Sequence, residues 1–125
     1  MQSESLFTRL GATRGIETIV DDIVQAHLEN PVIRARFLPI AEEPARLAAA
    51  KQHLCTFLAA GSGGPQAYAG RSMPDAHRGM NISANEYMAA IDDILAVLGR
   101  HGIDDETRKD VLAIAWSLKG DIVHV

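Results

Sequence analysis

The stretch "GSGGPQAYAGRSMPDAHRGMNIS", residues 61–83, interrupts a chain that otherwise has strong helical periodicity. Four glycines and two prolines come before His77, and these residue types do not support a long helix. Pro74 is suited to begin a helix and Gly79 to end one, which leaves room for about one and a half turns around His77. Long irregular segments in compact domains usually serve a function or surround a ligand, so we expect a functional role here.

Apolar residues on both sides of this stretch recur at steps of three and four, which predicts four long helices. The apolar stripes run from Ile16 to Leu28, from Leu47 to Leu58, from Tyr87 to Leu98 and from Val111 to Ile122. Pro31 stops the first helix. Ser83, with Glu86 three residues later, forms a capping box before the third. Strand-like alternation is nearly absent and no linker or repeat divides the chain, so the sequence predicts one all-α domain over residues 1–125.

The charge and hydropathy of the chain exclude several classes of function. Its formal net charge of −4 gives no electrostatic case for binding nucleic acid or an anionic membrane. No run of 18 apolar residues occurs, and the start "MQSESLFTRL" has no apolar signal region. The single cysteine, Cys55, excludes an internal disulfide and suits a reducing compartment. We therefore expect a cytoplasmic monomer.

A helical protein with 5% aromatic residues and one histidine on an irregular segment could complete its core with a cofactor. Haem is the first candidate, because a single neutral imidazole can hold its iron from one side. The alternative interpretation of His77 is a surface or capping histidine near a helix end. Spacing alone favours this alternative, since a lone histidine carries little information.

Two stretches of the sequence resemble the truncated haemoglobins, and this resemblance favours His77 as an iron ligand over a surface or capping histidine. "LFTRLGATRGIETIVDDIV", residues 6–24, is similar to their opening, where a Leu-Gly pair precedes the second helix. "FLAAGSGGPQAYAGRSMPDAHRG", residues 57–79, resembles their middle, with Gly-Gly-Pro, a tyrosine and Met-x-x-x-His. The similarity covers nearly the whole chain, and group I of the family fits best. It implies a globin-like two-over-two helical sandwich around one haem, with His77 as the proximal iron ligand.

Further positions carry over from the family as residues that contact the haem. Phe37 matches the aromatic side chain stacked on the porphyrin edge. The other positions expected to line the haem cavity are Ala50, Leu54, Phe57, Leu58, Met73, Ile82, Tyr87, Ala90 and Ile94. Lys51, Arg46 and Arg78 are candidates to pair with the propionates, although a solvated side chain is the ordinary alternative. We expect haem b to be bound without a covalent link, because the linking histidine of some relatives matches Gly120.

The distal side departs from the family pattern. Val24 stands where members usually have a tyrosine that donates to iron-bound oxygen, and Leu54 stands where many have glutamine. Such a charge-assisted hydrogen bond is worth roughly 1.5–3 kcal/mol, so its loss weakens oxygen retention by about tenfold or more. His53 matches a second haem-binding histidine of cyanobacterial members and could ligate iron from the distal side, or lie at the haem edge or in solvent. His27 is expected to be a satisfied core or interface histidine rather than a further distal ligand.

Three hypotheses for the function follow. The first is a haem protein that reversibly binds oxygen, carbon monoxide or nitric oxide, as in oxygen transport, sensing or scavenging. The second is a haem redox enzyme, acting as a nitric oxide dioxygenase or peroxidase with an external reductase as partner, or a bis-histidine electron-transfer globin. The third is a helical domain that has lost its haem, which Phe37, Met73 and His77 argue against. An apolar distal pocket disfavours peroxidase chemistry, which usually needs a polar acid–base residue.

Overall fold

The computed structural model describes residues 5–63 and 81–124, apart from the side chains of residues 57, 60 and 61. Every regular element in these two ranges is a helix. The helices are α1 (Leu6–Arg9), α2 (Ala12–Glu29), α3 (Arg34–Ala41), α4 (Pro44–Gly61), α6 (Ala84–Arg100), α7 (Asp105–Ser117) and α8 (Lys119–Ile122). The four predicted apolar stripes correspond to α2, α4, α6 and the pair formed by α7 and α8.

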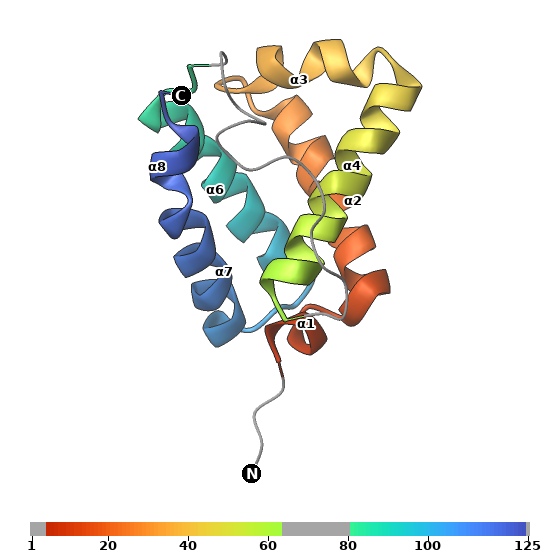
Figure 1. The fold of residues 1–125 in the computed structure, drawn as a ribbon, viewed down its shortest axis with the longest axis vertical. Coiled ribbons are helices and arrows are strands. Elements are labelled where there is room, and N and C mark those ends of the chain that lie inside the picture. Colours follow the sequence, from red (N-terminus) through yellow and green to blue (C-terminus); the bar gives the residue numbers. More distant parts are fainter. Residues whose placement is uncertain (1–4, 64–80, 125) are drawn as a thin grey trace.

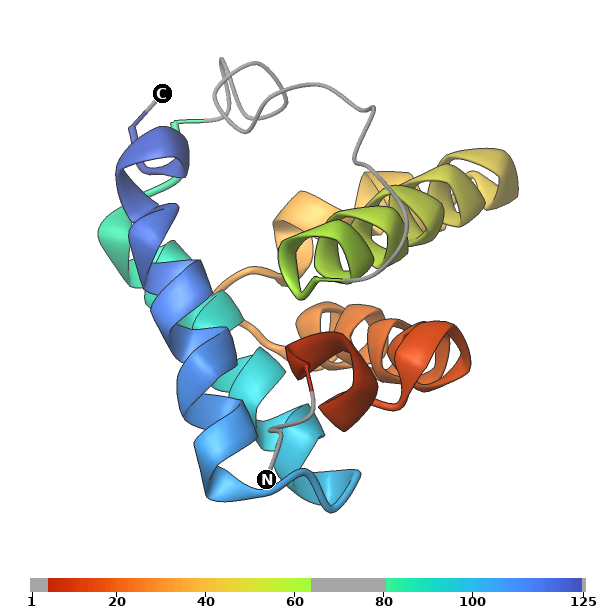
Figure 2. The same ribbon diagram turned by 60° about the horizontal axis from the view of Figure 1, so that its bottom comes forward.

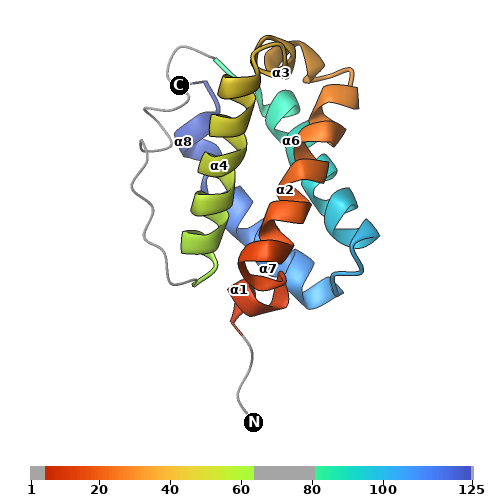
Figure 3. The same ribbon diagram turned by 90° about the vertical axis from the view of Figure 1, so that its right-hand side faces the viewer.

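Two antiparallel helix pairs form the body of the molecule. α2 lies beside α4 and α6 lies beside α7, and the two pairs cross at an angle (Figure 1, Figure 2). α2 also packs against α6, so it joins one pair to the other, as Figure 3 shows from the side. α3 connects α2 to α4 at one end of the molecule, and α1 lies at the other end (Figure 1). This arrangement has the two-over-two form that the sequence predicts.

Local signals in the sequence set several helix boundaries. α2 ends at Glu29, and Pro31 follows its C-cap residue Asn30. At the start of α6 the Ser83 side chain accepts from the backbone N–H of Glu86 at 3.1 Å, and the Glu86 carboxylate accepts from the backbone N–H of Ser83 at 3.1 Å. The predicted capping box is therefore confirmed.

Two parts of the fold differ from the sequence prediction. α3 has no buried residue, so it lacks the apolar stripe by which a helix is recognised in a sequence. The helix expected to reach Ile122 breaks at Leu118 into α7 and α8. Here the backbone N–H of Leu118 donates to the carbonyl of Ala115 at 3.2 Å, a tighter turn than the α-helical one. The apolar stripe continues across the break, because Ile122 belongs to the buried cluster that contains Tyr87 and Leu118 packs against this cluster.

The corner between α1 and α2 depends on two glycines. Gly11 has φ 95°, in the left-handed region that favours glycine. Gly15 faces the carbonyl group of Leu10, and a Cβ at Gly15 would lie 3.2 Å from that carbonyl carbon and closer still to its oxygen. Next to this corner, the backbone N–H of Phe7 donates to the carbonyl of Ser62 at 2.9 Å. These contacts hold the first helix against the end of α4.

The buried side chains gather where α2 meets α4, α6 and α7. The main cluster contains Leu10, Ile16, Ile19, Val20, Ile23, Val24, Ala59, Val97, Leu98 and Val111. A smaller cluster of Tyr87, Ile91 and Ile122 lies between α6 and α8. Near it the backbone N–H of His124 donates to the carbonyl of Ile82 at 2.9 Å, which ties the chain end to the start of α6. Within the described ranges, no helix has the length and apolar character needed to cross a membrane.

Candidate functional site

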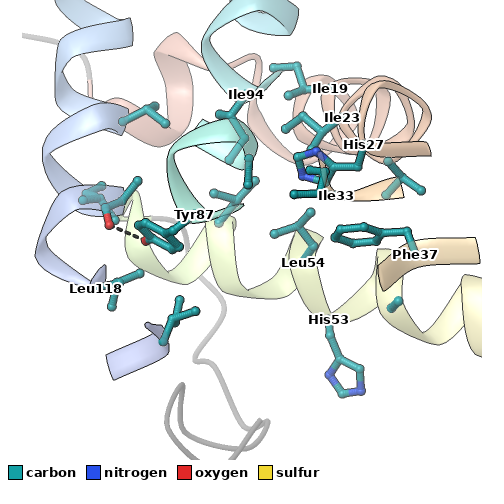
Figure 4. A pocket seen from close by; sticks show the side chains of 18 of the residues that line it. Ile19, Ile23, His27, Ile33, Phe37, His53, Leu54, Tyr87, Ile94 and Leu118 are labelled. Carbon is teal, nitrogen blue, oxygen red and sulfur yellow. Dashed lines mark hydrogen bonds between the residues drawn. The ribbon is translucent and has the colours of Figure 1, made fainter. Parts of the chain in front are cut away.

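A cavity of about 510 Å³ lies among the helices, with side chains from both helix pairs and from α3 in its wall (Figure 4). Its lining is mainly aliphatic and aromatic. Protein interiors are close-packed and contain few voids larger than a water molecule. An apolar space of this size therefore indicates a site for a bound group. The volume falls within the range of roughly 300–1,000 Å³ that is typical of small-molecule and cofactor sites. We therefore take this cavity as the candidate functional site.

The structure brings together most of the residues that the sequence predicts to line a haem cavity. The predicted residues found in the wall are Val24, Phe37, Ala50, His53, Leu54, Leu58, Ile82, Tyr87, Ala90 and Ile94. They come from α2, α3, α4 and α6 and from the segment just before α6. The predicted residues Met73, His77 and Arg78, and the side chain of Phe57, lie outside the part that the structure describes.

One wall of the cavity is formed by aliphatic side chains from the α2–α4 pair. Val24 is 8% exposed, and Leu54 on α4 is partly buried. In Figure 4 the Leu54 side chain points from α4 toward Ile33 and Phe37. Neither Val24 nor Leu54 can donate a hydrogen bond to a ligand. Val24 and Leu54 thus present apolar side chains to the cavity, as the sequence predicts.

Tyr87 contributes its ring rather than its hydroxyl to the site. The hydroxyl donates to the backbone carbonyl of Ala115 on α7 (Figure 4). Burial raises the pKa of this phenol above its ordinary value. Because the hydroxyl is already engaged with the backbone, Tyr87 serves as an apolar wall and links α6 to α7.

A charged pair lies at the margin of the cavity between α3 and α6. Arg36 Nε donates to Glu86 Oε2 at 2.6 Å, and its Nη2 donates to Oε1 at 2.9 Å. This paired hydrogen bonding, together with the capping-box bond from Ser83, lowers the pKa of Glu86 from 4.5 to about 2. The pair fixes α3, and with it Phe37, against the start of α6.

The basic residues predicted near the haem edge have protein partners or face solvent. Lys51 Nζ lies 3.2 Å from Asp21 Oδ1, and Arg46 Nη1 lies 3.3 Å from Glu43 Oε2. His53 is exposed, and in Figure 4 its ring points away from Leu54 on the same helix. His53 nevertheless belongs to the cavity wall, so its predicted roles at the haem edge and at the iron both stay predictions.

The structure adds a polar cluster that sequence reasoning found only in part. His27 is 6% exposed, as expected for a core histidine, and also lines the cavity. Its Nδ1 lies 2.8 Å from Oδ2 of Asp93, and Asn30 Nδ2 donates to both oxygens of Asp93 at 3.1 and 3.2 Å. Asp93 is a partner that no local pattern reveals, because 66 residues separate it from His27. Burial lowers the pKa of His27, although the Asp93 carboxylate acts against this shift.

Comparison with known proteins identifies the family. The family model for bacterial-like globins matches residues 5–124. The chain belongs to the bacterial-like globin family. This family implies haem binding, and the large apolar cavity is consistent with a bulky, flat, largely apolar group.

Relatives of this globin include group 1 truncated hemoglobins. It is 26% identical to the group 1 truncated hemoglobin GlbN of a Synechocystis species over 115 residues, which cover 89% of each chain. It is 24% identical to GlbN of a Nostoc species over 120 residues, covering 96% of this chain and 98% of the relative. The resemblance predicted from the sequence is therefore confirmed.

Solved structures confirm the globin's two-over-two fold. The truncated hemoglobin of Tetrahymena pyriformis in its Fe(III) form matches with a TM-score of 0.87 at 20% identity, covering 98% of this chain and 100% of that one. The 2/2 hemoglobin of a Synechococcus species, in the cyanomet state and with covalently attached heme, matches with a TM-score of 0.85 at 21% identity. That alignment covers 96% of this chain and 98% of the Synechococcus chain.

Proposed function

We propose that this globin binds one non-covalent haem b in the described cavity and reversibly binds diatomic gases at an iron held by His77. The observation that carries the proposal is the apolar cavity of about 510 Å³, whose wall contains ten of the residues predicted for the haem site and its distal pocket. When bound, the haem supplies an iron centre to which oxygen, carbon monoxide or nitric oxide can attach. The protein supplies a mainly apolar wall around that centre.

The residues of the chain divide into three roles in this proposal. His77 would hold the iron, as the family resemblance implies. Phe37 and Tyr87 would pack against the haem with their rings. Val24 and Leu54 would face the ligand without hydrogen bonding to it, so these two side chains would not retain a polar ligand strongly. Gly120 lacks a side chain that could form a covalent link, which supports non-covalent binding.

The alternative functions need features that the described residues support less well. A bis-histidine electron-transfer globin requires His53 at the iron, whereas its ring is exposed and points away from Leu54 (Figure 4). Nitric oxide dioxygenase or peroxidase activity would require an external reductase or a cosubstrate. We propose a monomer located in the cytoplasm, supported by the acidic, cysteine-poor composition of the chain.

Blocking the cavity with one added side chain tests the proposed haem site. Ala90 lines the cavity from α6, whereas its neighbour Ala89 is partly buried on the same helix outside the lining. Titration of each purified variant with hemin should give about one haem per chain for the wild type and for Ala89→Phe. Ala90→Phe should bind haem much more weakly, because its ring fills part of the cavity.

Circular dichroism should show that both phenylalanine variants remain helical, so that weak haem binding in Ala90→Phe is not due to unfolding. Full haem binding by folded Ala90→Phe would show that the haem lies elsewhere.

A further inference from the structure

The buried histidine of the cavity, His27, has one ring nitrogen fixed by a carboxylate. Its Nδ1 lies 2.8 Å from Asp93 Oδ2, and the side chains of His27 and Asp93 are 7% and 16% exposed. Asn30 donates to both oxygens of Asp93 and so holds the carboxylate in place. Phe37 packs against the imidazole, with 4.9 Å between the ring centres. The imidazole therefore has a defined position and a defined partner.

The second nitrogen, Nε2, has no hydrogen-bond partner among the described residues. Every buried side-chain nitrogen or oxygen in the described ranges has either a hydrogen-bond partner or some accessible surface. Nε2 therefore keeps accessible surface. His27 belongs to the cavity wall and does not line the surface hollow beside Asp93. Since His27 lines the cavity and not the hollow, we assign the accessible surface of Nε2 to the cavity side. Because Nδ1–H donates to the carboxylate, the neutral ring presents the lone pair of Nε2 there.

Asp93 reaches water on its other side. A surface hollow of about 420 Å³ is lined by Asp93 together with Glu29 and Arg100. The His27–Asp93 pair therefore separates the apolar cavity from a hydrated surface. A positive charge formed on the imidazole would be balanced by a carboxylate in contact with water.

We propose that His27 is the proton acceptor of the cavity, and that the cavity takes up small weak acids HX which bind the iron as the anion X⁻. This inference rests on the proposed function, because it needs a haem in the cavity. Hydrogen cyanide, hydrazoic acid and hydrogen sulfide belong to this class of ligand. His27 stands one helical turn after Val24 on α2, and the proposal gives the site a hydrogen-bond acceptor where Val24 supplies no donor.

The proton balance of this step is simple. The X–H bond breaks, its electron pair stays on X⁻, and the proton moves to the lone pair of His27 Nε2. The resulting imidazolium keeps its Nδ1–H bond to Asp93, so the pair is neutral overall. When the ligand leaves, X⁻ takes back the Nε2 proton. No oxidant or reductant is involved.

Other charged groups near the cavity do not compete for this role. Arg36 and Glu86 are paired with each other at the cavity margin, and His53 is exposed on α4. On the outer side, Glu29 and Arg100 face the hollow rather than the cavity. The burial that lowers the pKa of His27 keeps the imidazole neutral and able to accept a proton at neutral pH.

Comparing a protic ligand with an aprotic one tests the proposal. Hydrogen cyanide is almost fully protonated at pH 7 and must lose its proton to bind, whereas carbon monoxide has no proton to lose. The test variant is His27→Asn, whose amide can still donate to Asp93 but offers no basic nitrogen. The matched control is His101→Gln, because His101 Nε2 pairs with Asp22 at 2.7 Å away from the cavity.

Stopped-flow association should separate the two ligands in the haem-loaded protein. Cyanide association with the ferric form should slow by at least about tenfold in His27→Asn, since general bases contribute about 10²–10⁴-fold. Carbon monoxide association with the ferrous form should change by less than about twofold. His101→Gln should match the wild type for both ligands. Equal cyanide rates in His27→Asn and wild type, with haem and carbon monoxide binding intact, would overturn the inference without affecting the proposed function.

Nuclear magnetic resonance of the diamagnetic carbon monoxide complex gives a second readout that does not depend on ligand rates. Correlation of ring nitrogens with ring protons should show that the histidine signal missing in His27→Asn belongs to a ring that is neutral at pH 7 and protonated at Nδ1. Asp93→Asn should lower the pKa of this histidine further, because the counter-charge is lost. A His27 ring that carries its proton on Nε2, or that is an imidazolium at pH 7, would overturn the proposal.

Discussion

At the scale of single residues, the distal wall determines how long a gas ligand stays. Val24 and Leu54 are both apolar cavity residues, and the Tyr87 hydroxyl is engaged by the carbonyl of Ala115. A bound oxygen molecule with partial negative charge would therefore lack a donor from these positions. Fast oxygen release is the consequence that we expect.

Restoring a donor at Val24 should slow oxygen release. In Val24→Tyr the phenol can donate to the bound ligand, and a hydrogen bond worth roughly 1.5–3 kcal/mol corresponds to a rate lower by about tenfold or more. Stopped-flow release rates from the oxygenated ferrous protein measure this change. Val32→Tyr is the control, because Val32 is 47% exposed. Release that is equally fast in Val24→Tyr and wild type would mean that Val24 does not face the ligand.

The Arg36–Glu86 pair should make stability depend on acid pH. The pKa of Glu86 falls from 4.5 to about 2 on folding, so its contribution to stability is complete above pH 4.5 and is lost as pH falls toward 2. Glu86→Gln should lower the free energy of unfolding by about 1 kcal/mol at pH 7, and by less at pH 3.

Urea denaturation at the two pH values measures this difference. Glu43→Gln should have almost no effect at either pH, because Glu43 pairs with Arg46 at an exposed site. A Glu86→Gln effect that is the same at pH 7 and pH 3 would contradict the account.

At the residue scale, the burial of His27 can be predicted from the sequence, but its hydrogen-bond partners cannot. The sequence places His27 correctly in the core, because the histidine falls on the apolar face of a helix with a clear stripe. Asp93 and Asn30 are not predicted as its partners, since a polar pair between α2 and α6 depends on how the helices rotate and slide against each other. Periodicity identifies the face of one helix but does not specify which residue of another helix lies opposite.

At the scale of elements, the long helices follow from their sequence signals and the short ones do not. The capping box at Ser83 and the stop at Pro31 both act through neighbouring residues, so they can be read locally. α3 and the break at Leu118 depend instead on tertiary packing. α3 is fixed by its bond from Arg36 to Glu86, 50 residues away, and no local pattern contains that information.

The α1–α2 corner should be sensitive to an added methyl group. In Gly15→Ala the new Cβ would crowd the carbonyl of Leu10, so we expect a loss of about 1–3 kcal/mol in the free energy of unfolding. Gly120→Ala is the matched control, because a Cβ at Gly120 has no atom within 4 Å and the residue lies in α8. It should be neutral or stabilising by up to about 1 kcal/mol. Denaturant unfolding of both variants gives the comparison, and equal stabilities would contradict the assigned role of Gly15.

At the scale of the whole molecule, the cavity results from the crossing of two helix pairs. Apolar residues at helical spacing are expected to be buried, but the sequence pattern does not distinguish a filled core from one with a cavity of about 510 Å³. At the sequence level, His77 on its irregular segment makes haem a candidate, and the family resemblance is needed to favour it. The structure adds the independent observation that ten of the implied residues surround one space.

The measurement that tests the central claim most directly is the absorption spectrum of purified haem-loaded protein with and without His77. In His77→Gly the haem should be lost or bound only when imidazole is added, because the substitution removes the proposed iron ligand. His53→Ala, which changes another histidine of the cavity wall, should keep one haem per chain and the wild-type ferrous spectrum. A His77→Gly spectrum identical to that of the wild type without added imidazole would contradict the claim that His77 holds the haem.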